Sequence, residues 1–156
     1  MIYDAGLLGG APLFAFKQNI PNGQMLLHHE FDKDLEWAAP WIFPITEEHL
    51  EWLSNEHYTT SKFLWFESTA TQFDLVQAFR KIIYNNDPEH ATSFFRCWDL
   101  NVLLDDLRNE KSRCKYLFQF IDHLYLIRDE DMQAYYLDYW GVLNVKSMTH
   151  FNATKQ

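Results

Sequence analysis

The sequence predicts a single α/β domain, in which helices pack on the faces of a mixed β-sheet and a β-hairpin lies near the C-terminus. Three observations support this class. Strand and helix patterns alternate through the middle of the chain, which is typical of a sheet covered by helices. A length of 156 residues is enough for one domain and short for two. Hydrophobic residues make up 47% and charged residues 22%, an ordinary globular composition.

The first third of the chain predicts short elements separated by turns. Residues 1–4 indicate a strand, and the apolar stretch 5–16 predicts a short helix that ends near Asn19. Pro21-Asn22-Gly23 is typical of a turn. Residues 24–29 then read as a second strand.

The next segment is governed by prolines. Residues 32–36 are polar and predict a loop. Residues 37–45 are extended and belong at a sheet edge, because Pro40 and Pro44 have no backbone N–H to donate. Thr46 then has the position of a helix N-cap.

The middle of the chain contains the clearest helix. The apolar run at 63–66 (FLWF) predicts a central strand that is covered on both faces. Thr71 and Asp74 resemble a capping box, and an amphipathic helix follows them. Residues 93–98 alternate as a strand would, and Asp99 is placed to cap another helix.

The last part predicts a helix over residues 113–121 and a hairpin formed by 123–128 and 132–137. We therefore expect one domain over residues 1–140. Residues 141–156 are expected to form a polar tail that frays.

The charge narrows the classes of partner. The formal net charge is -9, which disfavours nucleic acid and anionic membranes and fits a basic protein partner. No apolar run approaches the roughly 20 residues that span a bilayer, and the N-terminus lacks the basic region of a signal peptide. Cys97 and Cys114 fit buried thiols in a reducing compartment. We expect a cytoplasmic protein.

Reactive side chains do not converge in any recognisable motif. His28 and His29 are neighbours on a strand and point to opposite faces, so they do not share a metal easily. Asp105 and Asp106 diverge around a helix in the same way. Cys97 lies mid-strand among bulky residues, whereas nucleophiles usually occupy a sharp turn or a helix N-terminus. We expect no enzymatic activity, no cofactor and no metal.

Arg96 and Asp99 form the most informative polar pair. An arginine in so apolar a strand must find a partner or reach solvent. Arg96 either braces the strand-to-helix corner through Asp99 or presents itself to a partner protein.

Aromatic residues make up 17% of the chain, which is more than one core needs. Trp and Tyr that remain at a surface favour protein interfaces. Core packing is the alternative role for each ring. The candidates for a partner-binding surface, together with Arg96 and Asp99, are Trp41, Trp98, Tyr135, Tyr136 and Trp140.

One stretch resembles the signature of a bacterial family. Residues 93–104 (SFFRCWDLNVLL) are similar to a strand that ends in Phe-Arg-aromatic-aromatic-Asp-Pro-Arg-Val-Leu. The family has proline and arginine where this chain has Leu100 and Asn101. Residues 1–4, 39–45 and 63–79 resemble further segments in the same order. The family is that of type VI secretion effector adaptors, also called Tap/Tec chaperones.

The resemblance implies a bacterial, cytoplasmic adaptor without enzymatic activity. It would bind a cognate toxin effector and help to load that effector onto the VgrG spike protein. Two rivals remain open. A small acidic domain also suits an immunity protein that neutralises a toxin by direct binding. A hydrolase would use Cys97 with His90 or His123 as the base.

Overall fold

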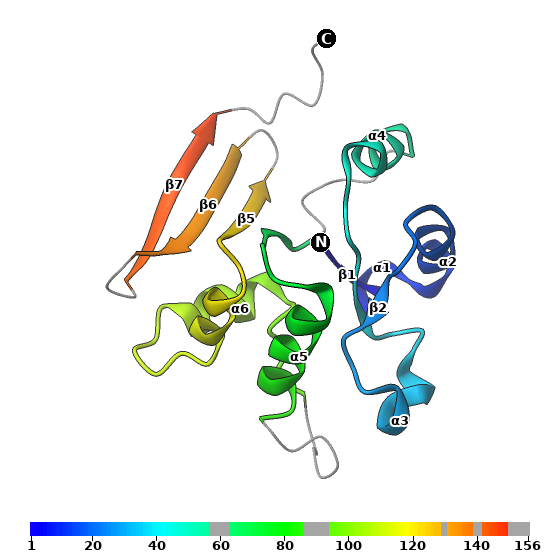
Figure 1. Cartoon of the computed structure of the whole chain (residues 1–156), viewed down its shortest axis with the longest axis horizontal. Coiled ribbons are helices and arrows are strands. Elements are labelled where there is room, and N and C mark those ends of the chain that lie inside the picture. The colour runs from blue at the N-terminus through cyan, green and yellow to red at the C-terminus, as the bar shows by residue number, and fades with distance from the viewer. Residues whose placement is uncertain (57–62, 86–93, 129–130, 139–141, 150–156) are drawn as a thin grey trace.

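The computed structural model describes residues 1–56, 63–85, 94–128, 131–138 and 142–149 (Figure 1). It confirms the α/β class and the C-terminal hairpin. The strands are divided between two antiparallel sheets rather than gathered in one mixed sheet. None of the helices in the described part of the chain is long and apolar enough to cross a membrane.

The first sheet has three strands in the order β1-β3-β2. They are β1 (Ile2–Asp4), β2 (Gln24–Met25) and β3 (Pro40–Ile42). The second sheet has four strands in chain order: β4 (Trp65–Glu67), β5 (His123–Arg128), β6 (Asp131–Leu137) and β7 (Leu143–Thr149).

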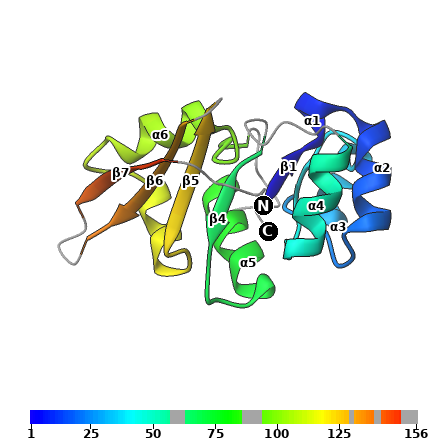
Figure 2. The same cartoon turned by 90° about the horizontal axis from the view of Figure 1, so that it is seen from above.

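The helices surround the two sheets. They are α1 (Ala5–Leu8), α2 (Gly10–Asn19), α3 (His29–Asp32), α4 (Glu47–Asn55), α5 (Gln72–Ile83) and α6 (Leu100–Leu107), with the 3-10 helices η1 (Lys33–Leu35) and η3 (Cys114–Gln119). Figure 2 shows α1, α2 and α4 on the side of the first sheet, and α6 on the side of the second.

The two sheets meet at one residue pair. The backbone N–H of Ile2 donates to the carbonyl of Leu64 at 2.8 Å, and the N–H of Leu64 donates back at 3.3 Å. On its other edge β1 pairs with β3, and the N–H of Phe43 donates to the carbonyl of Met1 at 2.9 Å. The N-terminal strand is therefore the shared boundary of both sheets.

A single hydrophobic core runs under both sheets. The part of the core beside the first sheet is rich in aromatic rings. The ring centroids of Tyr3, Phe43 and Phe63 lie 4.7 to 5.7 Å from that of Phe16. Offset and tilted ring pairs of this kind add to the energy of apolar burial. Among the described residues some aromatic rings are thus buried in this core, while others pack against it and remain partly exposed.

The helix starts lie where the sequence places them. The Asp99 carboxylate accepts from the N–H of Asn101 at 3.0 Å and from that of Val102 at 3.4 Å, and so caps α6. Thr71 Oγ1 accepts from the N–H of Asp74 at 3.2 Å at the start of α5. These bonds satisfy N–H groups that a helix cannot pair internally.

Several predicted elements are wrong. The predicted loop at residues 32–36 contains η1, the strand predicted for residues 24–29 ends at Met25, and β4 is the edge strand of its sheet rather than a central one. Residues 94–96 form no strand, and a turn follows at residues 97 and 98. The N–H of Cys97 donates to the carbonyl of Phe95, and the N–H of Asp99 donates to the carbonyl of Arg96. β3 is the central strand of its sheet, because Pro40 is its first residue and needs no ladder bond there. The expected polar tail contains β7, which pairs with β6 along its whole length.

Replacing Asp99 with alanine should lower the free energy of unfolding by about 1 to 2 kcal/mol, because the two N–H groups that it caps lose their acceptor. Urea denaturation monitored by circular dichroism measures this change. Asp105→Ala is the matched control, since that carboxylate is exposed and pairs only with exposed Arg108. Equal losses in both variants would contradict the capping role.

Candidate functional site

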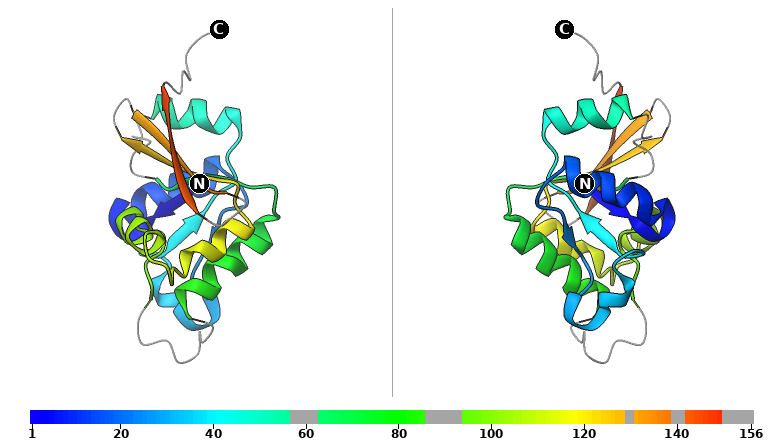
Figure 3. Two further views of the ribbon diagram at one scale, coloured as in Figure 1. Left: turned by 90° about the vertical axis from the view of Figure 1, so that its left-hand side faces the viewer. Right: turned by 90° about the vertical axis from the view of Figure 1, so that its right-hand side faces the viewer.

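An apolar groove of about 570 Å³ lies between α4 and the four-stranded sheet. Figure 3 shows α4 and strands β5 and β6 at the same end of the molecule, with α5 at the other end. The groove is lined by Met1, Ile42, Phe43, Pro44, Ile45, Leu50, Trp65, Phe66, Glu67, Ser68, Ala70, Gln72, Leu75, Tyr125, Ile127 and Met132. It opens directly above the junction of the two sheets.

One wall of this groove is the uncovered face of the four-stranded sheet. Strand alternation and the cross-strand pairs place Trp65, Tyr125 and Ile127 on the same face. The opposite face carries Leu124 and Leu126, both buried in the core. The other wall is formed by the segment that follows β3 and by Leu50 of α4.

Glu67 is the only charged side chain among the described residues that line the groove. Its side chain is 63% exposed, and its Oε2 lies 3.3 Å from His123 Nδ1 without a hydrogen bond between them. Burial of Tyr125, assisted by a hydrogen bond to Glu67, raises the pKa of the tyrosine well above its usual range. The Tyr125 hydroxyl therefore stays protonated as a donor at neutral pH.

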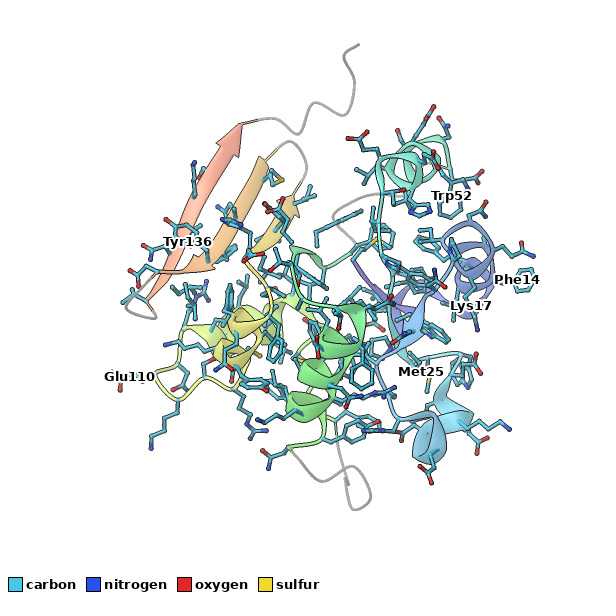
Figure 4. All side chains as sticks on the ribbon, viewed as in Figure 1. Phe14, Lys17, Met25, Trp52, Glu110 and Tyr136 are labelled. Carbon is cyan, nitrogen blue, oxygen red and sulfur yellow. The ribbon has the colours of Figure 1, made fainter. Side chains whose placement is uncertain are left out.

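The sequence-predicted surface aromatics are mostly interior. Trp41, Trp98 and Tyr135 are buried, so they belong to the core rather than to a partner-binding surface. The reason is that Trp41 lies on the central strand β3 and Tyr135 points to the covered face of its sheet. Tyr136 points to the open face, with its ring 5.8 Å from that of His123 (Figure 4). Trp140 lies outside the described residues.

Arg96 links two helix starts. Its guanidinium lies 3.4 Å from the carboxylate of Asp4 and 3.8 Å from that of Asp99. Asp4 accepts from the N–H of Gly6 at the start of α1, and Asp99 caps α6. The expected contact with Asp99 is present, and Asp4 is a second partner that the sequence did not reveal. More than half of the Arg96 side chain is exposed, so it also remains accessible at the surface.

A second, polar cavity of about 410 Å³ lies over α5. The Arg80 guanidinium donates to the carbonyls of Met25, Leu26 and Leu27 at 3.0 to 3.2 Å. The Tyr84 hydroxyl accepts from the N–H of His28. These polar groups are occupied in attaching the segment after β2 to α5, which is a structural role.

The two cysteine thiols lie close enough to each other and to the Asp106 carboxylate to interact electrostatically. Cys97 and Cys114 are both fully buried. The N–H of Cys114 donates to the Asp106 carboxylate at 2.8 Å, while Asp105 pairs with Arg108 at 3.2 Å. Within the described residues, no group of three or more His, Cys, Asp or Glu side chains has the arrangement of a metal site.

The groove was not predicted, because the apolar run 63–66 was interpreted as covered on both faces. In the structure Phe63 and Leu64 are buried, but Trp65 and Phe66 are half-buried. The available signal was the alternation of His123, Tyr125 and Ile127 along β5, which gives a sheet face with aromatic and aliphatic side chains. The sequence could not show that this face remains uncovered.

A family model described as "Domain of unknown function (DUF4123)" matches residues 1–114. The chain belongs to the DUF4123 family. The match includes the three-stranded sheet, β4 and helices α1 to α6, and it ends before β5. One wall of the groove therefore lies inside the DUF4123 region, and the strands that complete the other wall lie beyond it. No curated protein and no solved structure matches the chain.

The buried thiols should make stability fall at alkaline pH. Burial raises the pKa of Cys97 and of Cys114, so both stay protonated in the folded state while the unfolded chain ionises them above about pH 8.5. The free energy of unfolding should decrease above that pH by up to about 1.4 kcal/mol per pH unit for each thiol. Urea titrations between about pH 7.5 and 9.5 under reducing conditions measure the slope.

Cys97→Ala should show a shallower decrease over the same range, since one ionising group is gone. An unchanged slope would mean that burial does not keep the thiol of Cys97 protonated in the folded state.

Proposed function

We propose that this chain is a non-enzymatic adaptor that binds a cognate toxin effector in the bacterial cytoplasm and helps to load it onto the VgrG spike of a type VI secretion system. The observation that carries the proposal is the apolar groove beside the open sheet face. A concave apolar site of this size at the surface suits the side chains of another polypeptide. Binding would be stoichiometric, with the groove covering a segment of the effector.

The adaptor-like signature supports the secretion role. The stretch 93–104 lies inside the part of the chain that matches DUF4123. Its arginine and aspartate are the residues that join the starts of α1 and α6. The chain departs from the signature at Cys97, Leu100 and Asn101. The last two lie in the first turn of α6, where helix formation needs neither proline nor arginine. The departures therefore leave the described fold of this corner intact.

The surface of the groove also agrees with a protein partner. Trp65, Tyr125 and Tyr136 keep part of their rings accessible on the open sheet face. Aromatic rings supply large contact areas at low cost in conformational entropy, and they dominate the energetic centres of protein interfaces. A substitution that introduces a charge into such a surface leaves that charge buried and unpaired in the complex, and so weakens association strongly.

Coexpression of the chain with the toxin encoded by its neighbouring gene tests the proposal. The two proteins should elute together from a size-exclusion column. Ile127→Asp should reduce the amount of captured toxin at least about tenfold, because it places an uncompensated charge in the groove. Val145→Asp is the matched control: Val145 is exposed on β7, outside the groove lining, and pairs with Tyr135 of the covered face.

Absence of a complex with the wild-type chain, or equal capture by both variants, would contradict the proposal. The catalytic activity of the bound toxin separates an adaptor from an immunity protein. An adaptor leaves that activity intact, whereas an immunity protein suppresses it.

A further inference from the structure

We infer that the groove binds an extended, basic segment of its partner, which adds as a short strand to the free edge of β4. This inference rests on the proposed function, because it names the chemistry of the segment that the adaptor would grasp. Two independent observations carry it: an unpaired strand edge and the charge of the groove walls.

The unpaired edge follows from the junction of the two sheets. The N–H and carbonyl of Leu64 both bond to Ile2, so they point away from β5. Along an extended strand the backbone groups alternate in direction, so those of Trp65 point toward β5 and those of Phe66 point back to the side of Leu64. No described residue accepts from or donates to the Phe66 backbone on that side. Within the part of the chain that the structure describes, one N–H and one carbonyl therefore have no backbone partner beside the groove.

A strand edge of this kind is the usual docking place for an extended peptide. Main-chain bonds align the peptide, and every second side chain enters the pockets along the strand. A helical ligand would use its own backbone groups internally and leave those of Phe66 unpaired. The free edge therefore favours an extended ligand over a helical one.

The charges favour a basic ligand with apolar residues. Glu67 is the charged side chain among the described groove residues, and it lies one position after Phe66. Helix α4 contributes Leu50 to the lining and carries exposed Glu47, Glu48 and Glu51 outside it, and its range contains no lysine or arginine. A segment that alternates aliphatic residues with lysine or arginine would fill the apolar lining and neutralise these carboxylates.

A synthetic peptide of eight alternating leucine and lysine residues is the probe. It should bind the full chain at physiological salt, as measured by isothermal titration calorimetry, and the leucine–glutamate counterpart should not. Glu67→Gln should weaken binding of the lysine peptide about fivefold, because it removes one partly exposed ion pair between Glu67 and a peptide lysine. Glu110→Gln is the matched control, because Glu110 lies in the loop after α6, far from α4 (Figure 4).

Amide exchange measured by NMR tests the strand addition separately. Saturating lysine peptide should slow exchange at the Phe66 N–H at least about tenfold, because this group gains an acceptor. The Trp65 N–H should change little, since it already faces β5. The same peptide N-methylated at alternate amides should lose both the binding and the protection.

Three results would overturn this inference. They are equal weakening by Glu67→Gln and Glu110→Gln, equal binding of the leucine–glutamate peptide, and binding without protection of Phe66. If the toxin still copurifies and is lost on Ile127→Asp, the adaptor role stands and only the extended, basic character of the segment falls. If the toxin is not captured while the peptide binds as described, the adaptor role falls and the chemistry of the groove stands.

Discussion

The reciprocal bond between Ile2 and Leu64 is the constraint on which the rest of the structure depends. It joins a sheet built from strands within residues 2–42 to a sheet built mainly from strands within residues 123–149. Because β1 also pairs with β3, both edges of the first strand are occupied near Ile2. Burial of Tyr3 among phenylalanine rings then fixes this strand from its side-chain face as well. Apolar burial and backbone pairing therefore both hold the short strand β1 in place.

The groove is a geometric result of this one backbone pair between the two sheets. Two sheets that touch at one residue pair and then diverge leave an opening on one side of the contact, and here α4 and the open face of β4 to β6 form its walls. Apolar side chains line it because each wall continues a face of the core. A site formed in this way is rigid at its base, since the base is paired backbone. Such a base suits a protein that must hold another chain in a fixed orientation.

Local signals predicted the parts of the fold that depend on local chemistry. The caps at Thr71 and Asp99 are correct because an N-cap needs only the residues of the first turn. The turn at Arg96 was misread as a strand because an alternating apolar pattern does not distinguish the two. The number of sheets and the groove could not be predicted, since they follow from contacts between residues far apart in sequence. Burial of Tyr135 beside half-exposed Tyr136 depends on which sheet face the helices cover, and the sequence does not give that choice.

The central place of β1 also affects how the protein forms during translation. Its residues are translated before both of its partner edges, which lie at position 42 and at position 64. At elongation rates of roughly 5 to 20 residues per second, the nascent strand waits on the order of seconds before both partners emerge. During that interval its apolar side chains are open to chaperones and to premature association. Slowing elongation between the codons for Ile2 and Leu64 would therefore lengthen the vulnerable period.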